Sequence, residues 1–196
     1  ELGVPVVTTN HGPFQSELGD VYRAMAPSTP VIAISHHQAS TAQDTEVARV
    51  IHHGVDLEQF PVGSGEGGFA LFLGRMNPDK GVHTAIDLAR AAGVPLKIAA
   101  KMAEPAEREF FLEHVKPRLG EDVVYLGEVD HATKVELLGE ASCLLNPIEW
   151  HEPFGMVMIE SLACGTPVLA TRFGSVPEIV DDGVTGFVRD DADDLV

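Results

Sequence analysis

The stretch FALFLGRMNPDKGVHTAIDLARAAGVPLKIAAK, residues 69–101, decides the fold. It opens and closes on short apolar runs, residues 69–74 and 96–101, which lack regular polar alternation and therefore indicate strands buried on both faces. The segment between them, residues 82–92, is predicted to be a helix. A strand, a helix and a second strand of this kind indicate a β-α-β unit of a parallel sheet.

The same alternation continues on both sides of this unit. Further strands are predicted at residues 4–9, 30–35, 47–52, 123–127, 143–146, 167–171 and 186–188, and further helices at residues 105–119, 133–141, 155–164 and 176–180. Because right-handed crossovers place such helices on both faces of a sheet, we expect an α/β fold with a Rossmann-like, doubly wound parallel sheet.

A glycine-rich segment, residues 63–68, is predicted to link two domains. Residues 1–62 hold few strands, so we expect them to be the C-terminal remnant of an N-terminal Rossmann-like domain. Residues 69–196 are expected to form a nearly whole C-terminal domain, truncated at its end. The linker matches G-x-G-x-x-G, but a dinucleotide fingerprint follows a strand and opens a helix, whereas this segment precedes a strand. An NAD-dependent oxidoreductase is therefore disfavoured.

Composition and charge exclude several classes of protein. The 196 residues include 13 Lys and Arg against 30 Asp and Glu, a formal charge of -17 that repels phosphate backbones and argues against nucleic acid as a partner. This acid excess is expected to form a solvated surface, with a high-salt habitat as the alternative. Two cysteines, Cys143 and Cys164, are too few for a disulfide scaffold and favour the cytoplasm. No apolar run approaches the ~18–20 residues of a membrane span, although peripheral membrane contact stays possible.

A loop with two cations follows the predicted strand at residues 69–74. Its sequence is GRMNPDKG, residues 74–81, and it lies between the carboxyl end of that strand and the next helix, where open α/β sheets bind ligands. Arg75 and Lys80 stand five positions apart in a turn that can bring both onto one anion. The alternative is an ordinary solvated loop. Because cations are scarce in this chain, we favour an anion site.

The strongest functional signal is EWHEPFGMVMIE, residues 149–160. Glu152 precedes a predicted helix, Glu160 lies in its second turn, and Gly155 permits close backbone approach to the amides of the first turn, an anion site. Two carboxylates would repel a phosphate, but they can accept hydrogen bonds from sugar hydroxyls on either side of a diphosphate. The alternative is that both acids only complement the helix dipole.

The histidines carry no metal signal of their own. His36-His37 and His52-His53 are adjacent pairs, whose neighbouring side chains diverge on a strand and cannot easily share a zinc ion. No Asp-x-Asp pair suited to Mg²⁺ stands beside the predicted anion site, so we expect no catalytic metal and no cofactor. The aromatic run at residues 110–112 is expected to be core.

Taken together, these motifs resemble those of a known enzyme family. The pattern E-P-F-G-x-x-x-x-E resembles the donor-site motif of the retaining nucleotide-sugar glycosyltransferases of family 4, which have the GT-B fold. The resemblance continues through residues 53–56, 74–81, 163–168 and 174–179, so it spans nearly the whole chain. It looks closest to a bacterial subgroup of avilamycin-pathway type.

The resemblance implies a hexosyltransferase that moves a sugar from a nucleotide diphosphate to an unknown acceptor (glycan, lipid or small molecule) with retention. It assigns roles to the donor-site residues as follows: Gly74, Arg75, Lys80 and the amides of Phe154, Gly155 and Met156 at the diphosphate, Glu160 at the ribose, Glu152 at the donor sugar, and His11 reaching over from the acceptor domain. Two positions depart from the family pattern: His53, where Asn is usual, and Ala100, where Gly is common and where a side chain could crowd the nucleotide.

Two other functions share this architecture. A nucleotide-sugar epimerase would cleave the same bond without an acceptor, and a separated donor domain would only bind nucleotide. Because most of the acceptor domain is expected to be missing, the activity of residues 1–196 alone is left open.

Overall fold

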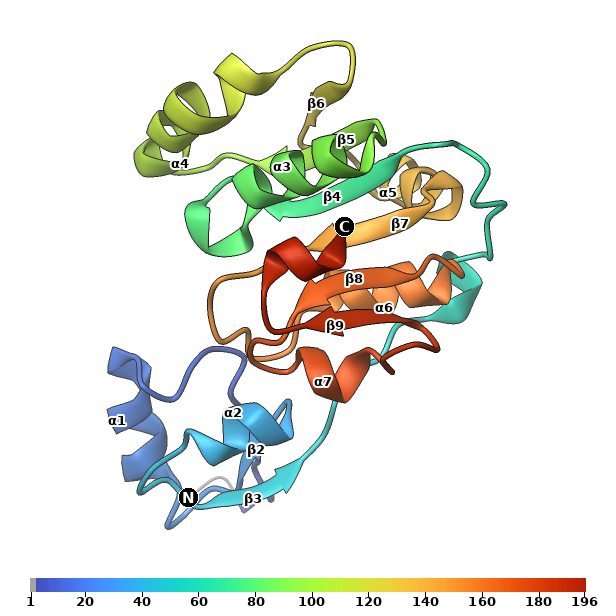
Figure 1. Ribbon diagram of the computed structural model, residues 1–196. Coiled ribbons are helices and arrows are strands. Elements are labelled where there is room, and N and C mark those ends of the chain that lie inside the picture. Colours follow the sequence, from blue (N-terminus) through green and yellow to red (C-terminus); the bar gives the residue numbers. More distant parts are fainter. Residues whose placement is uncertain (1–2) are drawn as a thin grey trace.

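A computed structural model describes residues 3–196 and contains two parallel sheets (Figure 1). The smaller sheet has the order β1-β2-β3, with β1 at Thr8–Thr9, β2 at Val31–Ala33 and β3 at Val47–Val50. Helices α1 (Glu17–Met25) and α2 (His36–Ser40) accompany it. We call residues 3–62 the N-terminal unit.

The larger sheet belongs to the C-terminal unit, residues 69–196. Its strands are β4 (Ala70–Arg75), β5 (Leu96–Lys101), β6 (Val123–Gly127), β7 (Cys143–Asn146), β8 (Val168–Thr171) and β9 (Gly186–Arg189). All are parallel and follow the order β6-β5-β4-β7-β8-β9. Counted from β4, this is the 3-2-1-4-5-6 order of doubly wound dinucleotide-binding folds. The predicted fold class is confirmed.

Helices cover both faces of the larger sheet. They are α3 (Val82–Ala92), α4 (Pro105–Phe110), α5 (His131–Glu140), α6 (Met156–Ala163) and α7 (Val176–Ile179). One apolar cluster joins the sheet to α3, and the other joins it to α5, α6 and α7, so α3 and α5–α7 lie on opposite faces (Figure 1). Among residues 3–196, no helix combines the length and the apolar character needed to cross a bilayer.

The order of strands changes direction between β4 and β7, and the loops that follow these two strands are bonded to each other. The N–H of Glu149 donates to the carbonyl of Asp79 at 2.9 Å. Gly81 has a φ of +71°, and a Cβ there would lie 1.9 Å from the carbonyl oxygen of Pro147. Only glycine therefore allows the two loops to approach this closely, and the crevice between them is where such sheets bind ligands.

The predicted linker is attached to the C-terminal unit. The N–H groups of Gly63, Gly65 and Gly67 donate to carbonyls of Cys164, Gly139 and Glu140 at 2.9–3.0 Å. The segment leads into β4 and opens no helix. This agrees with the conclusion from sequence that it is not a dinucleotide fingerprint.

Two predicted elements are wrong in extent. The first strand, expected at residues 4–9, is reduced to β1, and Val4, Val6 and Val7 are exposed. The helix expected at residues 105–119 ends as α4 at Phe110, then continues as a π turn (Phe111–Val115) and a 3₁₀ turn (Lys116–Arg118).

Pro117 prevents a return to the regular helix, since it lacks the N–H that would donate to the carbonyl of Glu113, although Lys116 before it keeps helical dihedrals. Of the aromatic run, Phe110 and Phe111 pack against the core, whereas Leu112 is 54% exposed. Further 3₁₀ turns lie at Leu57–Gln59, Pro78–Lys80 and Ala192–Leu195.

Candidate functional site

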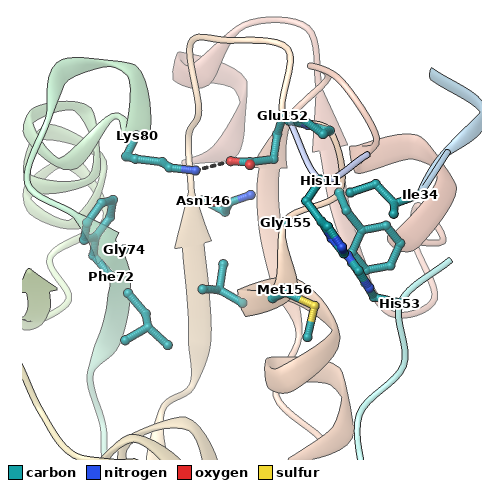
Figure 2. A pocket seen from close by; sticks show the side chains of 14 residues that line it. His11, Ile34, His53, Phe72, Gly74, Lys80, Asn146, Glu152, Gly155 and Met156 are labelled. Atoms are coloured by element: carbon teal, nitrogen blue, oxygen red, sulfur yellow. Dashed lines mark hydrogen bonds and ion pairs between the residues drawn. The ribbon is translucent and has the colours of Figure 1, made fainter. Parts of the chain in front are cut away.

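A cavity of about 300 Å³ lies at the switch point, between the loops that follow β4 and β7. Figure 2 shows that the N-terminal unit closes one side of it, through His11 and His53. Among the lining residues are His11, Ile34, His53, Gly74, Lys80, Asn146, Glu152, Phe154, Gly155 and Met156. Most of the residues predicted to form the donor site therefore line one cavity.

An ion pair crosses this cavity. The ammonium of Lys80 contacts Oε2 of Glu152, and their side chains are 21% and 14% exposed (Figure 2). The indole N–H of Trp150 also donates to Oε2, at 3.1 Å. Within the described residues both contacts fall on Oε2, which leaves Oε1 of Glu152 to accept from a ligand.

The start of α6 forms the floor of the cavity. Gly155 precedes the helix with a φ of +82°, and a Cβ there would lie 2.6 Å from Cε of Met158. This left-handed turn directs the chain into the helix at Met156. Because the first N–H groups of a helix have no partner within it, they and the helix dipole favour an anion at this place.

Two stacked imidazoles close the cavity from the N-terminal unit. The rings of His11 and His53 are 5.1 Å apart at their centroids and nearly parallel, and Nδ1 of His11 lies 3.3 Å from Nε2 of His53. Burial lowers the pKa of His53, and the nearby His11 lowers it further. The edge of Phe154 meets His53, with ring centroids 5.1 Å apart.

A second cavity, of about 260 Å³, continues from the first and shares Leu73, Gly74, Met156 and Val157 with it. Glu160 lines this second cavity, 12% exposed, and accepts from the ammonium of Lys134 at 2.6 Å. Ala100 also lines the wall of the second cavity. Glu152 and Glu160 thus serve two connected compartments, one on each side of the shared wall.

The structure does not bring Arg75 and Lys80 together. The guanidinium of Arg75 contacts carboxylate oxygens of Glu104 at 3.0 Å and Glu107 at 2.7 Å, and it does not line the first cavity. The hydrogen bonds that Arg75 donates, first to Glu104 and then to Glu107, raise the pKa of Arg75.

Glu107 is the better anchored of the two acids that hold Arg75. Burial opposes its ionisation, but the N–H groups of Glu104 and Ala103, together with the Arg75 guanidinium, lower its pKa. Its side chain is 4% exposed, whereas that of Glu104 is 66% exposed.

Several polar residues of the cavities were missed from sequence, namely Asn146, Lys101, Glu128 and Lys134. Asn146 ends β7, and a polar residue closing an apolar strand at the carboxyl edge of the sheet was a usable signal. Lys134 reaches Glu160 from α5, 26 positions earlier in the chain, and no local pattern marks it.

The side chains of each adjacent histidine pair were expected to diverge because both pairs were placed on strands, and for one pair this placement is wrong. His36 and His37 begin α2 and do not lie on a strand. His36 of one pair approaches His52 of the other. His37 stacks on His151, which belongs to neither pair, with ring centroids 4.9 Å apart.

The chemistry of the joined cavities follows from their lining. One ammonium and the start of a helix offer positive charge at the switch point, and a carboxylate stands in each compartment to accept hydrogen bonds. This arrangement suits an elongated ligand with a negative centre and hydroxyl groups on both sides.

Curated relatives share this sequence at moderate identity. The alpha-maltose-1-phosphate synthase of Mycobacterium tuberculosis is 29% identical over 237 aligned residues, which cover 97% of this chain and 60% of that protein. The glycogen synthase of the same species is 32% identical over 150 residues, 70% of this chain and 34% of that protein. The chain thus spans 60% or less of these two relatives.

Solved structures agree on the fold. AviGT4, a glycosyltransferase involved in avilamycin A biosynthesis, superposes with a TM-score of 0.75 at 28% identity, covering 99% of this chain and 57% of that one. Anabaena Alr3699/HepE in complex with UDP and glucose superposes with a TM-score of 0.82 at 22% identity, covering 97% and 60%.

Residues 56–195 match the protein family described as "Glycosyl transferases group 1". This range includes every strand and helix of the C-terminal unit. This chain belongs to the group 1 glycosyl transferases.

Proposed function

We propose that the protein transfers a hexose from a nucleotide-diphosphate sugar to an acceptor, with retention of the anomeric configuration. The observation that carries this proposal is the cavity at the switch point, where Lys80, Glu152 and the start of α6 meet. AviGT4 and HepE, whose structures resemble this chain, support a nucleotide-sugar donor and an enzyme of avilamycin-pathway type.

In this proposal the diphosphate lies at the wall shared by the two cavities. Breaking the bond to the anomeric carbon leaves negative charge on the diphosphate. The ammonium of Lys80 and the N–H groups of Phe154, Gly155 and Met156 stabilise that charge where it develops. One such fixed donor is worth ~3–4 kcal/mol of the activation free energy. These groups supply the positive charge without a catalytic metal.

The two carboxylates hold the ends of the donor. Glu152 accepts from hydroxyls of the transferred sugar through Oε1, while Lys80 and Trp150 fix the other oxygen. Glu160 accepts from the ribose hydroxyls, with Lys134 holding its carboxylate. The cavity that Glu160 lines adjoins the diphosphate site through Gly74 and Met156.

Arg75 serves as the second cation of the donor site once it leaves its acidic partners. Glu104 is 66% exposed, so the contact it makes is weak and exchanges readily with a diphosphate oxygen. The tighter tether is Glu107, which is nearly buried.

His11 lies on the acceptor side of the cavity, stacked on His53. We place the sugar between these imidazoles and Glu152. Retention follows if the departing diphosphate accepts the proton of the acceptor hydroxyl on the same face of the sugar, because no carboxylate lines the first cavity besides Glu152 among the described residues.

The test incubates the protein with radiolabelled nucleotide sugars, with and without candidate acceptors, after a thermal-shift screen against UDP, GDP, ADP and dTDP. We expect one nucleotide to raise the melting temperature most, and we expect nucleoside diphosphate release that depends on an acceptor. The anomeric configuration of the product reports on retention.

Other outcomes of the same experiment would replace the proposal. An isomerised sugar released without an acceptor would indicate an epimerase. Binding with no release under any condition would indicate a chain that only binds nucleotide. No response to any of the four nucleotides would contradict the donor site itself.

A further inference from the structure

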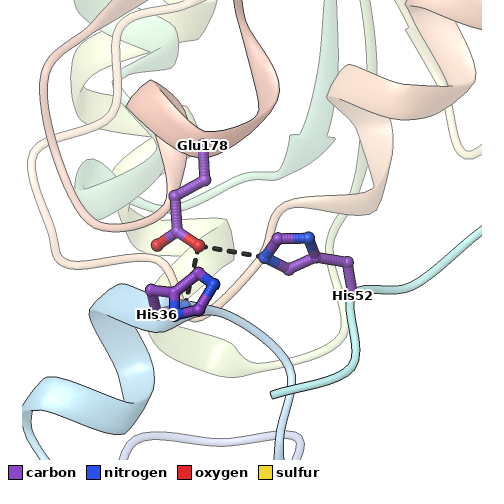
Figure 3. A group of neighbouring side chains, drawn as sticks. All are labelled: His36, His52 and Glu178. Atoms are coloured by element: carbon purple, nitrogen blue, oxygen red, sulfur yellow. Dashed lines mark hydrogen bonds and ion pairs between the residues drawn. The ribbon is translucent and has the colours of Figure 1, made fainter.

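Three side chains with metal-binding atoms meet where the two units touch. They are His36 at the first position of α2, His52 shortly after β3, and Glu178 on α7. Figure 3 shows the imidazoles of His36 and His52 near the carboxylate of Glu178. One nitrogen of each ring and one carboxylate oxygen all lie within 4.8 Å of one another.

The carboxylate is fixed by backbone groups. Oε1 of Glu178 accepts from the N–H of His37 at 2.6 Å, and Oε2 accepts from the N–H of His36 at 2.7 Å. These two bonds orient Glu178 whichever way the imidazoles turn. Hydrogen bonds that orient a ligand in this way are typical of sites that hold metal ions.

The two imidazoles lie at the surface, where the ring of His52 also meets that of Phe154, with centroids 5.8 Å apart. Both are exposed, and their rings meet edge to face with centroids 5.7 Å apart. Nε2 of His52 lies 3.0 Å from Oε2 of Glu178. Ligand atoms about 2.0–2.1 Å from a tetrahedral zinc ion lie roughly 3.3 Å from one another. The cluster therefore needs only small rotations of exposed rings to reach that geometry.

We propose that His36, His52 and Glu178 bind a divalent transition-metal ion of the zinc class, with a fourth position open to water. Two imidazole nitrogens and one carboxylate oxygen are a donor set that zinc accepts. In the occupied site Nε2 of His52 binds the ion in place of its contact with Oε2 of Glu178, and the neutral imidazole carries its one ring proton on Nδ1.

The ion joins the two units. His36 and His52 belong to the N-terminal unit and Glu178 to the C-terminal unit, so an occupied site ties one to the other. None of these three residues lines the first cavity, the one that contains Lys80 and Glu152. His53, the neighbour of His52, does line it. The metal therefore acts on the placement of the units and has no contact with the donor. This inference goes beyond the proposed transfer reaction and stands independently of it.

The test needs no nucleotide. The protein is freed of metal with a chelator and titrated with Zn²⁺ against a chromogenic chelator. We expect one equivalent to bind with micromolar affinity. His36→Ala, His52→Ala and Glu178→Gln should each weaken binding at least about tenfold, as loss of a metal-site residue does.

A matched control is available at His114. Its Nε2 lies 3.8 Å from a carboxylate oxygen of Glu113, and both side chains are more than half exposed, so the pair offers similar groups away from the cluster. His114→Ala should leave the zinc affinity unchanged. Far-UV circular dichroism checks that the variants stay folded, which we expect because His36 and His52 are exposed.

Co²⁺ provides a spectroscopic readout of the donor atoms. Cobalt bound by imidazole and carboxylate should give visible d–d bands and no thiolate charge-transfer band. The inference is overturned by any of three results: no stoichiometric zinc binding, binding that His36→Ala and His52→Ala leave unchanged, or a thiolate band that points to Cys143 or Cys164. Because nucleotide is absent throughout, none of these results bears on the donor site.

Discussion

Removal of the Lys80 ammonium should separate the contribution of the ion pair to stability from its contribution to catalysis. In Lys80→Met, the carboxylate of Glu152, 14% exposed, keeps the indole N–H of Trp150 as its one partner among residues 3–196. Losing one member of a buried ion pair costs several kcal/mol, and the partial exposure here reduces that to roughly 1–3 kcal/mol of unfolding free energy. Chemical denaturation measures this loss.

The catalytic loss in the same variant should be larger. Lys80 is the cation of the first cavity that we place on the departing diphosphate, and one fixed donor of this kind contributes ~3–4 kcal/mol to transition-state stabilisation. We therefore expect turnover to fall by about 10²–10³-fold. The assay is nucleoside diphosphate release at saturating donor.

A double variant distinguishes the two effects. In Lys80→Met with Glu152→Gln no unpaired charge remains, so stability should return toward the wild-type value while turnover stays low. Lys116→Met, at an exposed lysine of the 3₁₀ turn after α4, serves as the control and should change neither quantity. Near-normal turnover in Lys80→Met would refute the assignment of Lys80 to the diphosphate.

Four further predictions follow from particular contacts. Gly155→Ala should lower stability by about 1–2 kcal/mol, because the residue has a positive φ and its Cβ would meet Met158, and urea denaturation measures this. Arg75→Ala should reduce turnover at least about tenfold in the same release assay, since it removes the second cation of the proposed site. Glu107→Gln should lower stability at pH 7 by about 1–3 kcal/mol; because the pKa of Glu107 is lowered in the fold, this difference should shrink as pH falls below the ordinary value of 4.5. Burial raises the pKa of Cys143 to about 11, so a thiol reagent at pH 8 should react with it in the unfolded protein and not in the folded one.

Each of these predictions can fail in a distinct way. Wild-type stability in Gly155→Ala would mean that Met158 moves aside and that the turn tolerates a side chain. A loss of stability without a loss of turnover in Arg75→Ala would make its contacts to Glu104 and Glu107 its whole role. A stability difference in Glu107→Gln that is independent of pH would argue against an ionised carboxylate at this position. Rapid labelling of Cys143 at pH 8 in the folded protein would argue against the burial of its thiol.

The sheet could be predicted from sequence because its strands are apolar on both faces. The run at residues 96–101 has no alternation that would suit an exposed face, so it specifies a buried parallel strand without reference to the rest of the chain. The helix after it was predicted too long, because local spacing alone does not show that the helix changes its pitch at Phe111, before Pro117 removes an N–H donor. Short strands at the edge of a small sheet, such as β1, carry too little signal to fix their ends.

The lining of the first cavity could be predicted where its residues are neighbours in sequence. Glu152, Gly155 and Met156 lie within five positions, so the turn that begins α6 brings them together by local geometry alone. The pairing of Arg75 could not be predicted, because its partners Glu104 and Glu107 come from a different loop, and the choice between a diphosphate and two carboxylates depends on tertiary contacts. The histidine cluster was missed for the same reason, since its members meet only when the two units dock.

The attachment of the glycine-rich segment to the C-terminal unit decides where one unit can turn against the other. Within residues 3–196 the backbone passes between them at a single place, and from Gly63 onward it is bonded to the C-terminal unit. Phe60, 6% exposed, is already seated in the apolar cluster of that unit. The N–H of Ile51 still donates to the carbonyl of Ala33 in the N-terminal unit, at 2.9 Å, and Val55 already packs against the C-terminal cluster. A rotation of one unit against the other would therefore turn on residues 52–54, and the glycine-rich segment would move together with the C-terminal unit.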